Sequence, residues 1–592
     1  MRRNGLSTTP YSPIPLKILR IIWFNNGHAW HKILLTFAST YREDNRILMR
    51  LQLPLHSYQL RSGPASPARL VNCFPEALLP DAVYPVILTR APGVKAWTTV
   101  GTGPIKGMYA AAVEFATGNQ DYLYVVSGSE WYYVPQTAGV AGTPVLIGNT
   151  GNPSRIDMAS SATDVVLVNE PKGYAWSGPK VTGTHTAVSG NITTMIDSTA
   201  SFTPNGLIGG TISNTTDSSS GVIIDNDEIS VTVTALLGGT DNDWDTSDAY
   251  SIDMFREITD DDFVSRGAGD VEYLDKVFIF REPNSDRFFI GDIGSATSFD
   301  ALQFAKTDDT PDQLTGILAD RGILLAFGSK AIEVWENTGT AGVPFERIIN
   351  GTVEVGCLTS KSIARVFNRV LFVADDYTVR MFEGFQPMRA STHAIEQKLA
   401  KETIISSMAY SQEGHFFYSL TTDGGTYLYD IVTAEWSERE SYGKANWSPQ
   451  TTQPFAGKIL VGDSDSNKIG ELDFDTYADW GTTSRMEWTY QPVYAEGQRA
   501  FHDRLEIGLE TGVGLTTGQG VDPKIMLQKS DDGGETWQSL PDKSIGALGK
   551  RLVRPVWHNL GSARERVYRA AVSDPVSITI TDTIIEVRGG RL

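Results

Sequence analysis

The stretch Tyr122-Leu-Tyr-Val-Val-Ser-Gly-Ser-Glu-Trp-Tyr-Tyr-Val134 decides the fold, because its pattern returns six more times along the chain. A run of β-branched and aromatic residues, a turn containing Gly and a second such run are typical of an antiparallel hairpin. The later copies begin at Asp164, Asp275, Gly322, Asn368, Gly414 and Gly457. The successive spacings are therefore 42, 111, 47, 46, 46 and 43 residues.

Only the second spacing departs from the series, and removing residues 181–252, which number 72, reduces it to 39. Hairpins repeated at about this interval predict the blades of a β-propeller, in which each blade buries its faces only against its neighbours. A meandering sandwich fits less well, because the regularity persists over six intervals. We predict an all-β chain with a six- or seven-bladed β-propeller.

The removed stretch, residues 181–252, is rich in Thr, Ser, Gly, Asn and Asp, and no Lys or Arg occurs between Lys180 and Arg256. It predicts a small β-domain inserted into a blade loop, where an insertion costs little closure entropy. The first part of the propeller or a platform would then occupy residues 49–180, and the rest of the propeller would occupy residues 253–478. After about residue 478 the apolar residues alternate with period two, which predicts a C-terminal β-sandwich-like domain over 479–592.

The first 48 residues differ from the rest, with seven basic and two acidic residues and short apolar pieces broken by Arg, Asn and His. Arg20 interrupts the apolar core that a signal peptide requires. Three interpretations remain: a basic arm that orders on a partner, an amphipathic membrane-surface segment, or translated upstream sequence with Met49 as the natural start. We favour the last, because composition changes at Met49.

The chain is acidic, with 50 Lys+Arg against 70 Asp+Glu and a formal charge of −20. From Met49 onward the balance is 43 against 68, or −25. Tight binding to nucleic acid requires clustered Lys and Arg, because the release of condensed counterions supplies most of the affinity. We therefore expect no tight binding to DNA, and this charge balance is compatible with a position next to DNA. The chain contains no run of about 18 apolar residues, so we predict no membrane span.

The sharpest local motif is Ser530-Asp-Asp-Gly-Gly-Glu-Thr-Trp537, which fits the Asp-box of sialidase-like propellers. The motif is a hairpin device: Asp532 caps turn amides, Gly534 takes a conformation that other residues resist, and Trp537 fills the hairpin base. A sialidase would need several boxes, an arginine cluster and a nucleophilic Tyr. One box outside the repeats indicates a structural role.

Other candidate sites are weaker. Three acidic clusters, at residues 260–262, 241–245 and 463–467, offer oxygen ligands for a cation. A calcium loop that starts at Asp463 would need Gly at its sixth position and Glu at its twelfth, but the chain has Lys468 and Phe474 there. Cys73 and Cys357 form neither a disulfide framework nor a closed metal site on their own, and we expect two buried, reduced thiols. No catalytic motif occurs. We predict no catalytic, cofactor-binding or metal-binding residues, no cofactor and no enzymatic activity.

A further set of motifs lies at residues 57–62, 69–76, 91–93, 103–108, 327–339, 344–347, 356–357, 429–430 and 436–438. These motifs resemble the packaged-DNA stabilization proteins, also called tail hub or nozzle proteins, of short-tailed phages. The most specific is Phe327-Gly-Ser-Lys-Ala-Ile-Glu-Val-Trp-Glu-Asn-Thr-Gly339. The resemblance runs from about residue 50 to 475 and is weaker beyond. The first 48 residues and the 181–252 insert depart from it and inherit no role.

The resemblance implies a structural protein of the virion tail, assembled in the host cytoplasm. It implies a homo-hexameric ring docked under the dodecameric head-to-tail adaptor, with tail spikes or fibres outside and a needle or plug at the tip. The ring would extend the DNA conduit and retain the packaged genome, and DNA would pass through its channel without specific binding. The alternatives from other classes are a glycan-degrading or a host-binding tail protein built on a propeller.

Overall fold

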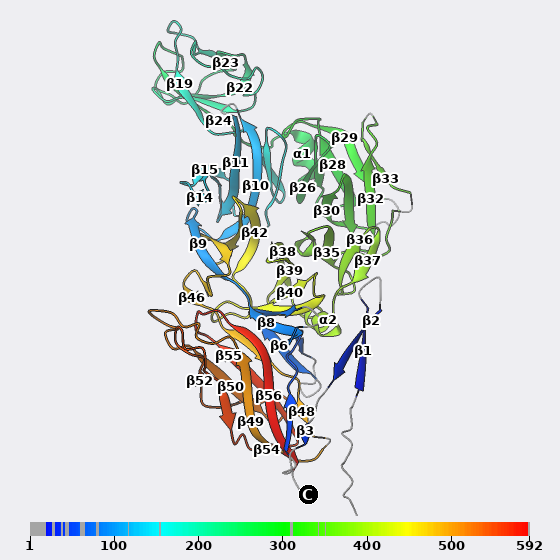
Figure 1. Ribbon diagram of the computed structural model, residues 1–592. Helices are drawn as coiled ribbons and strands as arrows, with labels where there is room; N and C mark the ends of the chain where they lie inside the picture. The colour runs from blue at the N-terminus through cyan, green and yellow to red at the C-terminus, as the bar shows by residue number, and fades with distance from the viewer. Residues whose placement is uncertain are drawn as a thin grey trace, which may run out of the picture. The chain divides into compact units, whose positions relative to one another are not determined.

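The computed structural model describes residues 46–589 except 60–65, 79–81, 116–117, 153–154, 308–311, 341, 350 and 496, together with the backbone of three earlier strands (Figure 1). The described chain is all-β apart from helices α1 (Asp261–Arg266) and α2 (His393–Leu399) and the 3₁₀ turn η1 (Ser360–Ser362). It forms two compact units, one of residues 92–482 and one that combines residues up to 91 with residues from 483 onward.

Within the described residues, unit 92–482 contains seven groups of four antiparallel strands, which we number as blades 1 to 7 in chain order (Figure 1). Blade 1 has β10 (Ile105–Phe115), β11 (Gly118–Ser127), β12 (Glu130–Val134) and β15 (Val145–Asn149). Blade 2 has β16 (Asp157–Ser160), β17 (Val165–Asn169), β18 (Lys172–Trp176) and β25 (Phe255–Glu257). Blade 3 has β26 (Asp270–Leu274), β27 (Val277–Arg281), β28 (Arg287–Gly291) and β29 (Phe299–Lys306).

The remaining blades follow the same order. Blade 4 has β30 (Leu314–Asp320), β31 (Ile323–Gly328), β32 (Ile332–Asn337) and β33 (Phe345–Arg347). Blade 5 has β34 (Ala364–Val366), β35 (Arg369–Val373), β36 (Val379–Glu383) and β37 (Gln386–Arg389). Blade 6 has β38 (Ile404–Gln412), β39 (His415–Thr422), β40 (Thr426–Asp430) and β41 (Glu435–Arg439), and blade 7 has β42 (Pro449–Phe455), β43 (Lys458–Asp463) and β44 (Lys468–Asp473).

The seven hairpins predicted from the sequence are the second and third strands of the seven blades. Their apolar runs are continuous because a blade is packed between two neighbours and buries both faces. All five residues of β17, of β27 and of β40 are buried. The first strands of neighbouring blades, such as β16 and β26 or β38 and β42, lie against one another and form the inner wall of the ring. The predicted β-propeller fold is confirmed, with seven blades.

The fourth strand of blade 7 comes from the other end of the propeller sequence. Strand β9 (Gly93–Thr99) pairs antiparallel with β44, from Lys468 opposite Thr99 to Asp473 opposite Gly93. Short strands β45 (Ala478–Asp479) and β46 (Thr482–Thr483) extend the same sheet. The ring is therefore closed by hydrogen bonds between its first and last strands, and it begins at residue 93, earlier than the hairpin repeat alone suggests.

The 181–252 insert interrupts blade 2 between β18 and β25 and forms a sheet of its own. Its strand order is β19 (Val181–Thr184), β24 (Ala249–Asp253), β21 (Thr211–Asn214), β22 (Ser220–Asn226), β23 (Ser230–Val233) and β20 (Thr194–Ile196). A separate apolar core fills it, with Met195, Phe202, Trp244 and Tyr250 among its buried members. The first and last strands pair, Val181 opposite Ile252, so the chain enters and leaves at neighbouring points.

The other unit is a sandwich of two sheets built from both ends of the chain. One sheet contains β4 (Arg46–Arg50), β56 (Thr579–Gly589), β49 (Ala500–Leu509), β53 (Val556–His558) and β8 (Val86–Arg90), which pairs β7 (Cys73–Ala77). The facing sheet contains β6 (Pro67–Val71), β47 (Met486–Thr489), β55 (Glu565–Val572), β50 (Lys524–Ser530) and β51 (Gln538–Ser539). Both ends of the chain contribute to its core, in which Leu70, Leu88, Trp488 and Ile585 are buried together.

The sequence predicts the first part of the propeller or a platform in residues 49–180. Residues 67–90 pair with C-terminal strands instead, because β6 has β47 as a neighbour and β8 has β56. Upstream of them, β1 (Leu19–Asn25) and β2 (Trp30–Thr36) pair as a hairpin, and β4 runs through Met49. The start at Met49 stays a prediction. Within the described residues no helix is long and apolar enough to cross a bilayer.

Deletion of residues 181–252 tests whether the insert folds apart from the blades. We expect a soluble protein with one cooperative propeller transition when Lys180 is joined to Asp253, because these residues flank a strand pair and already form an ion pair of 2.8 Å. Circular dichroism and denaturant unfolding would measure this. The matched control is a deletion of blade 5, residues 364–389, which should be insoluble. An insoluble insert deletion would show that the insert belongs to the propeller core.

Candidate functional site

A cluster of buried charge lies where blades 2 and 3 meet. Asp270, at the start of β26, has a side chain only 1% exposed, and the guanidinium groups of Arg155 and Arg281 both contact its carboxylate. Asp157 on β16 accepts a hydrogen bond of 3.0 Å from the backbone amide of Val271. These contacts join the inner strand of one blade to the inner strand of the next.

Burial dominates the electrostatics of this cluster. Burial raises the pKa of Asp157, and the nearby Arg155 only partly offsets it. Glu272 lies on β26, two residues after Asp270. Burial raises the pKa of Glu272 well above its ordinary value, and the negative charge of Asp157 adds to that effect. Burial lowers the pKa of Arg155, but Asp270 and Asp157 outweigh it, so the pKa of Arg155 is raised overall. Arg155 therefore stays charged and acts as a counter-ion.

This arrangement supports a structural role better than acid–base chemistry. A general acid or base must reach a substrate atom, whereas Asp270 is enclosed by protein and shared between two guanidinium groups. The sequence did not reveal the cluster, since Arg155 and Asp270 are more than a hundred residues apart. The buried charges hold adjacent blades in one fixed register, because a shift of one blade would leave a charge buried without a partner and destabilise the propeller.

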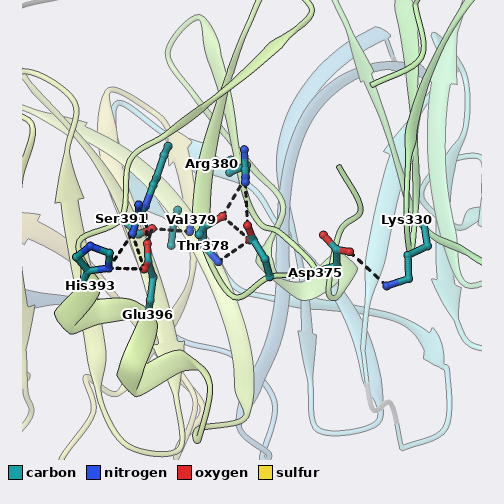
Figure 2. Close-up of polar contacts among 10 residues, drawn as sticks. Lys330, Asp375, Thr378, Val379, Arg380, Ser391, His393 and Glu396 are labelled. Atoms are coloured by element: carbon teal, nitrogen blue, oxygen red, sulfur yellow. Dashed lines mark hydrogen bonds and ion pairs between the residues drawn. The ribbon is translucent and has the colours of Figure 1, made fainter. Parts of the chain in front are cut away.

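A second polar cluster ties blade 5 to helix α2 and to blade 4 (Figure 2). In the turn before β36, the Asp376 carboxylate accepts a hydrogen bond of 3.0 Å from the Thr378 amide and pairs with Arg380 at 2.8 Å. Burial raises the pKa of Asp376, but the hydrogen bonds from Thr378 and Arg380 lower it by more than burial raises it. The pKa of Asp376 therefore lies below its usual value. Lys330 of blade 4 reaches Asp375 at 3.3 Å.

The same cluster fixes the start of helix α2, as Figure 2 shows. The hydroxyl of Ser391 accepts a hydrogen bond of 3.0 Å from the Val379 amide and donates one of 2.6 Å to Glu396. Glu396 also pairs with Arg389 at 2.5 Å and lies 3.3 Å from His393. Since Arg389 and His393 are largely exposed, these pairs contribute little stability and mainly orient the helix.

The acidic clusters named from the sequence serve mostly as turn caps. Asp260 caps α1 by accepting from the Asp262 amide, and Asp463 accepts from the Asp465 amide at 3.1 Å. Asp241, Asp243 and Asp245 do gather, with one carboxylate oxygen of each within 4.8 Å of the others. No described group beside these three carboxylates indicates a bound cation, so they stand as an acidic loop of the insert.

The Asp-box forms the turn between β50 and β51. The Asp532 carboxylate accepts from the Thr536 amide at 2.9 Å, and the Ser530 hydroxyl accepts from the Gly534 amide at 2.8 Å. Gly534 has φ +101°, which other residues rarely adopt. The predicted turn-capping contacts are present. Trp537, however, stacks on Arg569, whose guanidinium carbon lies 4.0 Å from the ring centroid.

Both cysteines are buried and unpaired, as expected. Burial raises the pKa of Cys357 to about 11 and that of Cys73 further still, so both are protonated thiols at neutral pH. Of the histidines, His415 pairs with Asp430 at 2.8 Å, and His28 and His31 lie outside the described side chains.

Comparisons with known proteins follow the same division into propeller and sandwich. Residues 239–477 match a family model described as bacteriophage P22 Gp10, beta-propeller, and residues 486–588 match one described as bacteriophage P22 Gp10, beta-sandwich. No curated protein sequence matches the chain.

Solved propellers resemble the chain only in outline. BamB from Moraxella catarrhalis is 9% identical, with 72% of this chain and 97% of that one covered and a TM-score of 0.30. The beta-propeller domain of Myceliophteria thermophila Cps50 (Swd1) is 9% identical over 64% and 98%, with a TM-score of 0.34. The Neurospora crassa Pan2 WD40 domain is 7% identical over 64% and 96%, with a TM-score of 0.33.

The substitution Asp270→Asn tests the buried charge cluster. It leaves two guanidinium groups without their shared carboxylate, and we expect the free energy of unfolding of the propeller to fall by about 3 kcal/mol. Denaturant unfolding would measure it. The control is Glu170→Gln, because Glu170 is 42% exposed and lies 3.6 Å from Arg281, so its loss should change stability by less than about 0.5 kcal/mol. Equal stability of the two variants would contradict this role.

Proposed function

The chain belongs to the family of bacteriophage P22 Gp10, and from this premise we propose that it forms the hub, or nozzle, of a short-tailed phage tail. In this proposal six copies form a ring beneath the dodecameric head-to-tail adaptor. The ring continues the DNA conduit, retains the packaged genome and carries spikes or fibres and a tail needle or plug. The observation that carries the proposal is the match of both the propeller and the sandwich to one family.

The construction of the chain supports a mechanical role. The propeller closes on itself through β9 and β44, and the ion pair of Arg155 with Asp270 joins blades 2 and 3. A closed ring of blades has few free strand edges and resists deformation, as a component under the load of packaged DNA requires. The carboxyl groups with raised pKa values, on Asp157 and Glu272, lie within this packing, and no observation favours the glycan-degrading alternative.

The acidity of the chain suits a conduit. Each Lys or Arg contact with phosphate releases counterions and adds affinity, and several contacts in register would stall a moving duplex. A wall with a charge of −25 per chain from Met49 onward repels DNA within a Debye length, about 8 Å at physiological salt. Retention would then depend on a narrow gate or on the partner plug, with this protein as its platform.

A phage that carries an early stop codon in this gene tests the hub assignment. We expect heads that package DNA and then lose it, because the conduit below the adaptor stays open. Nuclease-protected DNA per purified particle, measured against particles complemented from a plasmid, gives the result. Heads that retain their genome without the chain would contradict the proposal.

The acidic wall has its own test with the purified chain. We expect no measurable affinity for duplex DNA in a filter-binding titration at physiological salt. The control is the same titration with a basic DNA-binding protein of similar size. Tight binding that weakens steeply as salt rises would refute a repulsive wall, since that dependence reports phosphate contacts.

A further inference from the structure

Two neighbouring loops of the sandwich expose aliphatic side chains to water. Residues 511–521 follow β49 and residues 545–553 precede β53, and we call them together the aliphatic loops. The exposed fractions are 97% for Leu552, 61% for Leu548, 42% for Val521 and 39% for Leu515. Other side chains form the buried core of the sandwich. Large aliphatic groups gathered on one surface are typical of an interaction site.

Hydrogen bonds hold the aliphatic loops together. The amide of Gly549 donates to the carbonyl of Gly512 at 3.0 Å, and the amide of Gly512 donates to the carbonyl of Ile545 at 3.2 Å. The Thr511 hydroxyl donates to the carbonyl of Arg551 at 2.7 Å. Gly512 has φ +78°, a backbone conformation that other residues rarely adopt. The exposed side chains therefore stand on fixed turns, and binding through them requires little further ordering of the chain.

The charge around the aliphatic loops is opposite in sign to that of the whole chain. The loops themselves contain no Asp or Glu, and both of their basic residues, Lys550 and Arg551, are exposed. With their flanking residues, 510–524 and 542–554, they contain five basic and three acidic residues, whereas the chain has a formal charge of −20. One of the five, Arg554, pairs with Glu506. Lys550 and Arg551 thus present cations beside the exposed aliphatic groups.

The composition of the aliphatic loops favours a lipid surface over a protein partner. The cores of protein interfaces are enriched in Tyr, Trp, Phe and Met and depleted of Lys. The aliphatic loops contain none of these four enriched types, and they include Lys550. Aliphatic groups beside Lys and Arg are the combination with which peripheral segments bind an anionic bilayer, because the apolar groups leave water while the cations approach lipid phosphates.

We propose that the aliphatic loops bind the surface of an anionic lipid bilayer. Leu548 and Leu552 would enter the boundary between headgroups and acyl chains. Lys550 and Arg551, which lie between the two leucines in the sequence, would keep their charged ends at the level of the lipid phosphates. The proposal concerns the sandwich alone and does not depend on the hub function proposed above.

Cosedimentation of the purified full chain with lipid vesicles tests the proposal. We expect binding to vesicles of equal parts phosphatidylcholine and phosphatidylglycerol, and about tenfold weaker binding to phosphatidylcholine alone, because only the anionic surface attracts the two cations. Leu548→Ser combined with Leu552→Ser should weaken binding about tenfold, since less apolar surface leaves water. The matched control is Leu302→Ser, because Leu302 is 79% exposed on blade 3, and it should leave binding unchanged.

A fluorescent label at position 552 distinguishes insertion from adsorption. Cys73 and Cys357 are both buried, so acrylodan should label the single exposed thiol of Leu552→Cys. We expect its emission to shift to the blue with the anionic vesicles, because the label enters an apolar environment. The same label on Leu302→Cys should show no shift.

Lys550→Gln combined with Arg551→Gln provides a second variant should the leucine substitutions perturb the fold. It should weaken binding to the anionic vesicles about twentyfold, since each cation near such a surface contributes about fivefold. Equal binding to both kinds of vesicle, losses in the leucine variant no larger than in its control, or binding without a shift of the label at position 552 would overturn the proposal. Absence of vesicle binding would also overturn it, in favour of a protein partner, and would leave the hub function to its own test by DNA retention.

Discussion

The pairing of β9 with β44 is the constraint on which the rest of the structure depends. A propeller repeats radially, so its first and last blades expose strand edges unless one sheet contains strands from both ends of the repeat. Here the residues immediately after the sandwich's N-terminal strands supply that edge. The same arrangement lets the chain leave blade 7 and complete the sandwich, whose core contains residues from before and after the propeller.

Closure also explains the distribution of buried charge. Once the ring is fixed, each inner strand has a determined neighbour, and charged groups between blades must find their partners there or remain unpaired at a cost of several kcal/mol. Asp270, Arg155 and Arg281 satisfy this requirement across blades 2 and 3. The surface network of blade 5 and helix α2 is looser and more exposed, consistent with a role in orienting local elements.

The sequence predicted the propeller well because hairpins are local: each copy contains its own two buried strands and turn, and all seven became the middle of a blade. Composition predicts an inserted domain over residues 181–252, and in the structure Val181 lies opposite Ile252 in paired strands. Its boundaries stay a prediction. The sequence did not predict that residues 67–90 belong to the sandwich. Their strand partners, β47 and β56, lie near the other end of the chain and leave no local signal in the sequence. The charge cluster of Arg155 and Asp270 escaped notice for the same reason, since only the packing of blades 2 and 3 brings the two residues together.

The position of the chain in the particle tests the account most directly. A cryo-electron microscopy map of the tail should contain six copies of the seven-bladed propeller in one ring below the adaptor, with an open axial channel. A map that places the chain elsewhere, as a single spike or as a peripheral adhesin away from the DNA axis, would contradict it.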